Sequence, residues 1–448
     1  MTSTTTSSMY VDKDALRARF AAAISSMYRS EVPLYGDLID IVRDTNESVL
    51  NGINAKLQCS DATGIKADIE RLTQERHGAI RLGTPYELRT IKGVFEILAS
   101  EEARRLSLEL LEKRDIFSDL LLSILNAAEL QGGRLKEEQT ETFIREALST
   151  FSWQSVAAAT FDQYQVLKAE HPILADIACF QSAHINHLTP RTLDITAVHL
   201  AMKRAGMAAK DAIEGPPARE CPILLRQTSF LALEEAVQFR SMDTHGLQKS
   251  MVEASHKARF GEIEERGAAV TPKGRELYDK LLRESKKQSA DAAATEVDAI
   301  TTKVFKEFPD TWKQLRLQGL IYCEFHLKQA ATMSSLDLDL RSGSILEQLL
   351  SMNVVEAVPI TYEDFLPFSA AGIFQSNMQT DGLSKCASKC SVGVTRSIAD
   401  PKGLEKAMDA SISDLDAWYS AVQTKSIEEV GKRLGLTFGE LMPSNAHS

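Results

Sequence analysis

Three short segments of the chain combine metal-ligand side chains with glycines or with residues typical of β-strands. These segments are Arg76–Gly83, His184–Arg191 and Arg259–Gly267. Together they could supply two imidazoles and one carboxylate, a set that leaves three positions of an Fe(II) ion open for substrate and dioxygen. His77, His187 and Glu262 are separated by 110 and 75 residues (187 − 77 and 262 − 187), so only the fold could assemble them. The alternative is that they are ordinary hydrogen-bonded residues of a core or a surface.

The residues alone leave the ligand choice open in two places. In an extended strand, His184 and His187 face opposite sides, so both cannot readily bind one metal ion. Glu262 and Glu264 share a face, and nothing local distinguishes them.

Amphipathic periodicity predicts a largely helical N-terminal part that must help to position these segments. We expect helices after Asp12, after Pro33 and after Thr84, and over residues 101–130 and 136–150. The third of these begins at a Thr-Pro-x-Glu signal, with a hydroxyl for the N-cap, a proline in the first turn and a carboxylate at the third position.

From residue 176 onward the pattern changes to shorter extended pieces. We expect extended chain over Ile177–Leu188, Pro222–Gln227 and Lys257–Ala268, with a helix between Asp194 and Gly206. A long charged helical stretch is expected from Lys273 to Phe308. The whole pattern predicts an α+β fold.

Composition and charge narrow the class of protein. The 448 residues include 51 Lys+Arg and 62 Asp+Glu, which gives a formal net charge of −11, and 44% are hydrophobic. We therefore expect an ordinary globular protein that does not bind nucleic acid. No apolar run is long enough to span a membrane, and the richest candidate, Ile116–Leu125, is interrupted by polar residues.

Targeting and redox features favour a cytoplasmic protein. Met1–Ser8 has neither the basic residue nor the apolar core of a signal sequence. The six cysteines are scattered, which suits reduced thiols. Only Cys386 and Cys390 form a local pair, and one Cys-x3-Cys pair is weak support for a zinc site.

Several long runs of the sequence resemble one known family. They are SMYRSEVPLYGDL (26–38), RHGAIRLGT (76–84), HINHLTPRTLDI (184–195), PILLRQTSF (222–230), ARFGEIEERGAA (258–269) and YEDFLPFSAAGIFQSN (362–377). Over about residues 12–377 the chain is similar to the 2-oxoadipate dioxygenase/decarboxylase family, also called hydroxyglutarate synthases, a divergent branch of the vicinal oxygen chelate superfamily. The resemblance implies a curved mixed β-sheet that encloses a metal site, with extensive helical additions.

The resemblance also implies an Fe(II)-dependent reaction. In it, 2-oxoadipate and O2 give 2-hydroxyglutarate and CO2, in lysine catabolism. Carried over residue by residue, the resemblance places the iron ligands on His77, His187 and Glu262, and so prefers Glu262 to Glu264. Glu264 or Arg259 is then expected to orient a ligand or the substrate.

The implied substrate is a dicarboxylic 2-oxo acid. The family's substrate arginine falls on Arg81, whose fixed fork of donors suits a carboxylate. The resemblance implies that Phe368 and Ser369 line the substrate pocket, next to His77 and His187.

We expect a single large catalytic domain with two modules and a C-terminal helical part. The expected ranges are a tail at 1–11, a domain at 12–442 with modules at about 12–170 and 171–380 and a helical part at 398–442, and a tail at 443–448. Within the first module the chain departs from the family near residues 98–101, where members carry several dozen more residues. Loss of sheet there would leave His77 less firmly held.

Other functions stay open at this point. The chain is alternatively an inactive or ligand-binding paralogue that lacks part of the first module, another metal-dependent vicinal oxygen chelate enzyme, or a hydrolytic zinc enzyme. Val270–Leu277 resembles a winged-helix junction, but the acidic charge and the lack of a preceding basic helix argue against a transcription regulator. The sequence does not determine the oligomeric state.

Overall fold

The computed structural model describes residues 10–57, 72, 75–80, 101–114, 116–170, 172–242, 248–289, 294–328, 344–364, 402, 405, 411 and 413–442. The chain divides into two compact units. The first takes in Met1–Ile213, Gln227–Glu264 and Ala371–Ala410, and the second Glu214–Arg226, Glu265–Ala370 and Ser411–Ser448.

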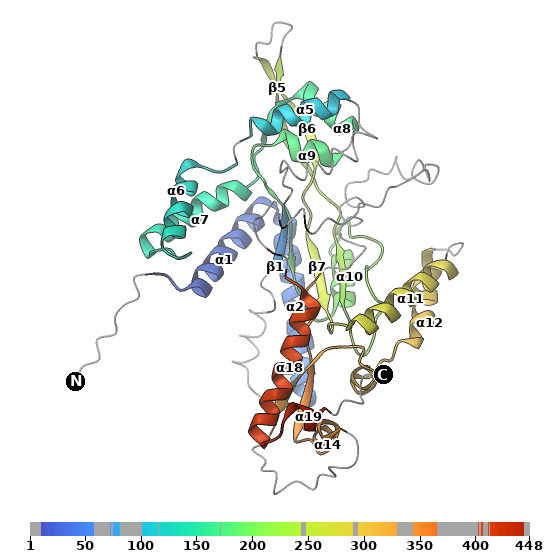
Figure 1. The fold of residues 1–448 in the computed structure, drawn as a ribbon. Coiled ribbons are helices and arrows are strands. Elements are labelled where there is room, and N and C mark those ends of the chain that lie inside the picture. The colour runs from blue at the N-terminus through green and yellow to red at the C-terminus, as the bar shows by residue number, and fades with distance from the viewer. Residues whose placement is uncertain are drawn as a thin grey trace, which may run out of the picture. The chain divides into compact units, whose positions relative to one another are not determined.

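Helices supply most of the N-terminal part of the first unit (Figure 1). They are α1 (Lys13–Glu31), α2 (Pro33–Leu57), α5 (Glu101–Glu112), α6 (Asp119–Leu130), α7 (Glu137–Phe151), α8 (Phe161–Glu170), α9 (Pro172–Cys179) and α10 (Ile195–Arg204). Helix α1 begins as predicted, because the Asp12 carboxylate accepts hydrogen bonds from the main-chain N–H groups of Asp14 and Ala15. The predicted start of α2 at Pro33 is also confirmed. Helices α1, α6 and α7 lie side by side.

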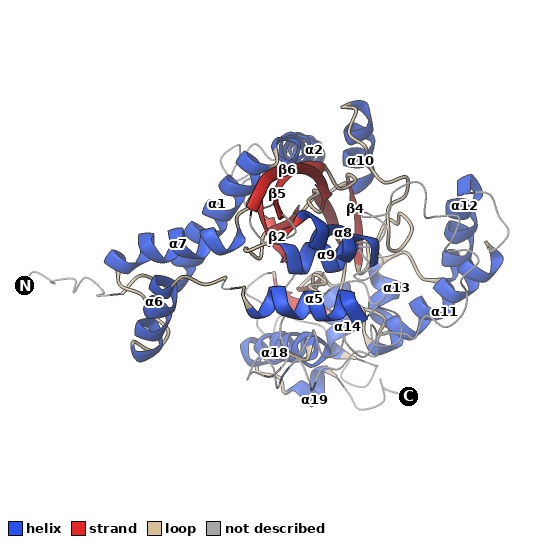
Figure 2. Ribbon diagram, turned by 90° about the horizontal axis from the view of Figure 1, so that it is seen from above, coloured by secondary structure: helices blue, strands red, loops and turns tan. Residues whose placement is uncertain are grey.

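One sheet of the first unit has three strands, β2 (Val156–Thr160), β5 (Glu234–Met242) and β6 (Gln248–Lys257), in the order β2-β5-β6. Strand β2 runs parallel to β5, and β5 runs antiparallel to β6. Helices α8 and α9 pack against this sheet, as Figure 2 shows from above.

A second group of strands carries the candidate site. Strand β1 (Glu75–Ile80) pairs antiparallel with β3 (Ile185–Pro190), and β4 (Leu225–Ser229) pairs with β7 (Glu262–Arg266). A parallel bridge between Arg191 and Glu264 joins the ends of β3 and β7, where the Thr192 N–H donates to the Glu264 carbonyl. Close to the starts of these strands, the Phe260 N–H donates to the Asn186 carbonyl. Strands β3 and β7 therefore run side by side.

An apolar core packs behind β3 and β7. Its members come from α1, α2, α10 and the two strands, and they include Tyr28, Leu38, Val198, Leu188 and Ile263. All six residues of β3 are buried, the polar ones included. Because a buried polar group must find a partner, the polar residues of β3 are expected to be engaged in specific contacts.

The second unit has a core of its own. Its elements are α11 (Pro272–Gln288), α12 (Ala294–Val304), the 3-10 helix η1 (Phe305–Glu307), α13 (Trp312–Leu317), β8 (Cys323–Leu327), α14 (Ile345–Ser351), β9 (Val355–Pro359), α18 (Leu415–Leu434) and α19 (Phe438–Leu441). Strands β8 and β9 form an antiparallel pair, and α18 packs against β8. The core of this unit includes Tyr278, Phe308, Leu349 and Tyr419.

The predicted α+β class is confirmed, although the described strands form sheets of two or three strands rather than one continuous curved sheet. Three predicted elements were wrong in extent. Ile177–Cys179 belongs to helix α9, since a short apolar run fits a buried helix as well as a strand. The 101–130 helix is two helices, because the Ser118 hydroxyl caps a new start. The Lys273–Phe308 stretch comprises α11, α12 and η1.

Two further expectations lie outside the described residues, namely the helix start at Thr84 and the cysteine pair Cys386 and Cys390. Within the described part of the chain, no helix is both long enough and apolar enough to cross a bilayer.

Candidate functional site

His187 and Glu262 lie against one another where β3 and β7 run side by side. The His187 Nε2 atom is 3.7 Å from the Glu262 Oε1 atom, and the two side chains are only 3% and 5% exposed. This distance is longer than that of a hydrogen bond. Two donors at right angles on a metal ion, with bonds of about 2.1 Å, lie roughly 3 Å apart. The pair therefore suits a shared cation after a small adjustment.

Thr189 holds the glutamate of this pair. Its hydroxyl donates a hydrogen bond of 3.1 Å to Glu262 Oε1, and both groups are buried. Ligand carboxylates are commonly held by such a second contact, which fixes their orientation. Thr189 was not among the residues predicted from the sequence. It stands two residues after His187 on the same face of the strand, and this position is the signal that would have indicated it.

For His77 the structure gives the main-chain position in strand β1. It pairs in register with Thr189, and Ala79 pairs with His187. Because residues opposite one another in an antiparallel pair share a face, the register position of His77 belongs to the face that carries Thr189 and His187. The strands approach closely at the next residue, since a Cβ on Gly78 would lie 2.5 Å from a methyl carbon of Leu188 and would displace that side chain.

Among the side chains that the structure describes, no three histidines, cysteines or acidic residues gather closely enough to hold a metal ion. Of the three predicted ligands, His187 and Glu262 are described with their side chains and lie together. Arg81, Phe368 and Ser369 lie outside the described residues.

A β-bulge sets the position of His187. Ala79 pairs with His187 but Ile80 pairs with Ile185, so Asn186 is an extra residue in β3. Ile185 and Leu188 are three residues apart and both join the apolar core, which a regular strand would not permit. Bulges of this kind re-aim side chains and are common next to active sites.

The ring of Phe260 packs against the His187 imidazole, with ring centroids 4.7 Å apart and planes inclined by 30°. Behind both lies Tyr28 of α1, whose hydroxyl is 2.8 Å from the Asn186 carbonyl and 2.9 Å from the Phe260 carbonyl. Burial raises the pKa of Tyr28 well above its usual range, so the hydroxyl keeps its proton and acts as a donor.

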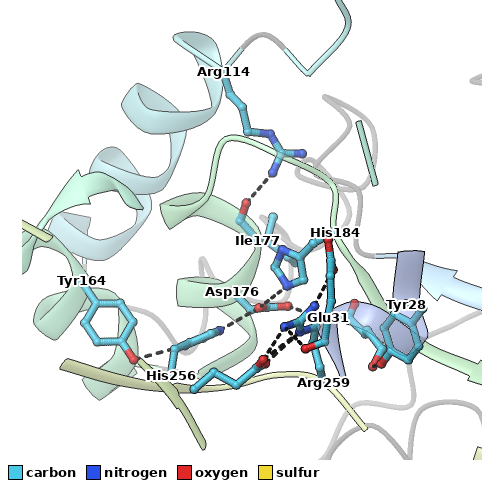
Figure 3. A network of polar contacts seen from close by, with 11 residues as sticks. Tyr28, Glu31, Arg114, Tyr164, Asp176, Ile177, His184, His256 and Arg259 are labelled. Atoms are coloured by element: carbon cyan, nitrogen blue, oxygen red, sulfur yellow. Dashed lines mark hydrogen bonds and ion pairs between the residues drawn. The ribbon is translucent and has the colours of Figure 1, made fainter. Parts of the chain in front are cut away.

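A separate buried network lies beside this site and centres on Asp176 of α9 (Figure 3). Asp176 Oδ1 is 2.8 Å from His256 Nε2 and 3.2 Å from His184 Nε2. Asp176 Oδ2 accepts a 3.3 Å hydrogen bond from the Asn186 side chain. His184 and His187 therefore have different partners, and His184 belongs to the network of Asp176. The bulge at Asn186 interrupts the strand alternation on which we based this expectation, so the partners and not the alternation separate the two rings.

Arg259 has a different role from the one expected. It is 2% exposed, its Nε donates to both carboxylate oxygens of Glu235 at 3.1 and 2.9 Å, and its Nη1 donates to Glu31 at 2.6 Å. Its guanidinium also stacks 4.7 Å above the Trp153 ring. Because these contacts engage its donors, Arg259 ties α1 to β5 rather than orienting a ligand or substrate.

Comparison with known proteins gives a consistent match. The model of the 2-oxoadipate dioxygenase/decarboxylase family matches residues 20–101 and 95–377. The chain is 38% identical to the 2-oxoadipate dioxygenase/decarboxylase of Pseudomonas putida, over 95% of this chain and 98% of that protein. It is 36% identical to the protein of the same name from Escherichia coli, over 94% and 99%.

The fold is similar to that of a solved structure, the Pseudomonas putida hydroxyglutarate synthase in complex with 2-oxoadipate. The TM-score is 0.76 at 37% identity, and the match covers 96% of this chain and 100% of that one.

The alignments also contain gaps in this chain. The Pseudomonas putida alignment extends over 478 positions but takes in 95% of the 448 residues, about 426, so about 52 positions (478 − 426) are gaps in this chain. The two matched parts of the family model meet at residues 95–101.

Proposed function

Because the chain belongs to the 2-oxoadipate dioxygenase/decarboxylase family, we propose that it converts 2-oxoadipate and dioxygen to 2-hydroxyglutarate and carbon dioxide. Relatives named for this activity match nearly the whole chain, and a solved relative holds 2-oxoadipate. The observation in this chain that carries the proposal is the buried approach of His187 to Glu262.

Our proposal includes Fe(II) held by His77, His187 and Glu262. The donor set fits, because two imidazoles and a carboxylate suit ferrous iron and leave positions open. The bound iron would supply the redox chemistry that dioxygen needs. Glu262 contributes the negative charge that offsets the cation, and Thr189 holds its carboxylate in place. Burial of His187 and Glu262 keeps bulk water away from them.

The proposed substrate contacts rest on the family resemblance. Arg81 would bind a substrate carboxylate through its fork of donors, with Phe368 and Ser369 along the same pocket. The overall reaction balances without a further reductant, because CO2 carries away the substrate's own C1 carboxylate oxygens. One oxygen atom of O2 then completes the new carboxylate at the former 2-oxo carbon, and the other becomes the hydroxyl on the neighbouring carbon. The same proposal includes four further features: a vicinal-oxygen-chelate arrangement of the strands, a single catalytic domain, a cytoplasmic location and a role in lysine catabolism.

Oxygen consumption tests the proposal. The purified chain with Fe(II), ascorbate and 2-oxoadipate is expected to consume dioxygen and to release CO2 and 2-hydroxyglutarate in equal amounts. His187→Ala, which removes an imidazole ligand, is expected to abolish the reaction. The Pseudomonas putida relative under the same conditions is the positive control. If the relative is active and this chain is not, the proposal fails for this chain.

A second candidate is a paralogue that binds the ligand without turning it over. The family match favours it, because the model matches in two parts that overlap at residues 95–101, which indicates residues absent from the module that carries His77. Thermal stabilisation by 2-oxoadipate with Fe(II), without oxygen consumption, would identify this function.

A further inference from the structure

The bulge at Asn186 needs an explanation, because nothing in a regular strand pair holds an extra residue in place. One residue of slip in β3 would move His187 to the opposite face of the strand. The fold must therefore fix the main chain at this point. The contacts of the Asn186 carbonyl show how it does so.

Two donors meet at that carbonyl. One is the Phe260 main-chain N–H at 2.9 Å, which ties the bulge to the residues before β7. The other is the Tyr28 hydroxyl at 2.8 Å, which also lies 2.9 Å from the Phe260 carbonyl. The single hydroxyl thus lies between the main chain next to His187 and the main chain two residues before Glu262.

The side chain of Tyr28 is itself held by its packing in the helical core. Its side chain has no exposed surface, and its ring packs edge-on against Tyr35 with centroids 5.0 Å apart. A rigid ring anchored in the helical core holds its hydroxyl in one place. The two ligand-bearing segments are therefore positioned relative to α1 as well as to one another.

We propose that Tyr28 is a positioning residue for the metal site, which sets the bulge at Asn186 and through it the spacing between His187 and Glu262. This inference rests on the proposed function, since it takes those two residues as ligands. Tyr28 is separated from them by the main chain and touches neither side chain in the contacts described. Its effect should therefore appear in metal affinity and ligand geometry rather than in stability alone.

Cobalt binding by the full chain tests the inference. Co(II) reports ligand geometry through its visible absorption, and a competing chelator gives its affinity. Tyr28→Phe keeps the ring and removes only the hydroxyl. Its matched control is Tyr419→Phe, because Tyr419 is also buried and its hydroxyl accepts a 2.7 Å hydrogen bond from a main-chain N–H group, that of Glu363, in the second unit.

We expect Tyr28→Phe to lower the Co(II) affinity by about 10-fold, in the range known for residues that support metal ligands, and to change the visible spectrum. We expect Tyr419→Phe to leave both unchanged, with a similar fall in the melting temperature of the metal-free protein. Replacement of Tyr28 by p-aminophenylalanine, which restores a donor, should recover most of the affinity and decides the matter if Tyr28→Phe does not fold.

The inference is overturned if Tyr28→Phe binds Co(II) like the unaltered chain, or if Tyr419→Phe loses as much affinity. Failure of the proposed metal site is recognised separately, because then the unaltered chain binds no Co(II) and His187→Ala makes no difference.

Discussion

Glu262 and Glu264 stand two residues apart on β7 and are both buried, yet their described contacts differ. The Glu262 carboxylate accepts a hydrogen bond from Thr189 and lies 3.7 Å from His187. The main-chain carbonyl of Glu264 instead accepts from Thr192 and joins β7 to the end of β3. The short distance from Glu262 to His187 supports our proposal that Glu262 is the ligand.

Paired substitutions test this assignment. Glu262→Gln retains the shape and the acceptor for Thr189 but removes the charge, so we expect at least about a 10-fold loss of Fe(II) affinity and a matching loss of activity. Glu264→Gln is the control and should retain both. Chelator competition measures the affinities, and melting temperatures show that each variant is folded. The reverse ranking would transfer the ligand role to Glu264.

At the scale of the elements, an ion cluster joins helix α1 to strand β5. Arg259 donates to Glu31 at the end of α1 and to Glu235 in β5, and all three are largely withdrawn from water. Removing one partner of such a buried cluster leaves the other charges uncompensated. Since Tyr28 lies on the same helix, the cluster also helps to hold the helix that contacts the ligand segments.

We therefore expect Arg259→Met to lower the free energy of unfolding by about 3–5 kcal/mol, although methionine fills much of the same space. Chemical denaturation of the metal-free chain measures the change. Arg145→Met is the control, since Arg145 pairs on the surface with its neighbour Glu146 and such pairs contribute about 0–1 kcal/mol. Equal effects of the two substitutions would contradict a stabilising role for the cluster.

The same variant has an expected pH signature. Burial raises the pKa of Glu31, while Arg259 lowers it. Without Arg259 the pKa of Glu31 in the folded chain rises further above its unfolded value of about 4.5. The free energy of unfolding of the variant is therefore highest, as far as Glu31 is concerned, below pH 4.5, where the carboxyl group is protonated in both states. It falls as the pH rises through the folded-state pKa, where the buried carboxyl group loses its proton. The difference in melting temperature between Arg259→Met and the unaltered chain should narrow from about pH 7.5 to about pH 5. A constant difference would contradict this cause.

At the scale of the whole molecule, the alignment of the chain with its relatives has more positions than the chain has residues. The alignment to the Pseudomonas putida protein has 478 positions for a chain of 448, and the family match divides at residues 95–101. A module that holds a ligand must be well supported, because small displacements of a ligand weaken a metal site. We therefore propose that residues absent near 98–101 decide between enzyme and paralogue.

A chimera tests this point. We expect that inserting the corresponding segment of the Pseudomonas putida relative between residues 98 and 101 raises the Fe(II) affinity and the oxygen consumption of the chain by about 10-fold or more. An insertion of Gly-Ser residues with the same length is the control. If the unaltered chain already matches the relative in activity, the segment is dispensable and the paralogue candidate is excluded.

The sequence by itself determined the α+β class, the starts of α1, α2 and α10, and the segments that carry the candidate ligands. These features depend on local caps, on periodicity and on runs of residues, all of which are present in the primary structure. The extent of α9 was not predictable in the same way, because a short apolar run fits more than one conformation. The start of α6 does have a local signal, the Ser118 cap, which our prediction of one helix over 101–130 missed.

Only the tertiary structure decided which of the neighbouring candidates come together. The bulge at Asn186, the tie from Tyr28 and the contact of Thr189 with Glu262 all join residues far apart in the chain. His184 lay next to the predicted ligand in the sequence, and Arg259 was expected to orient a ligand or the substrate. In the structure Asp176 lies against His184, and Glu31 and Glu235 bind Arg259. Partner choice inside a core depends on register and on burial, which the order of residues along one strand does not contain.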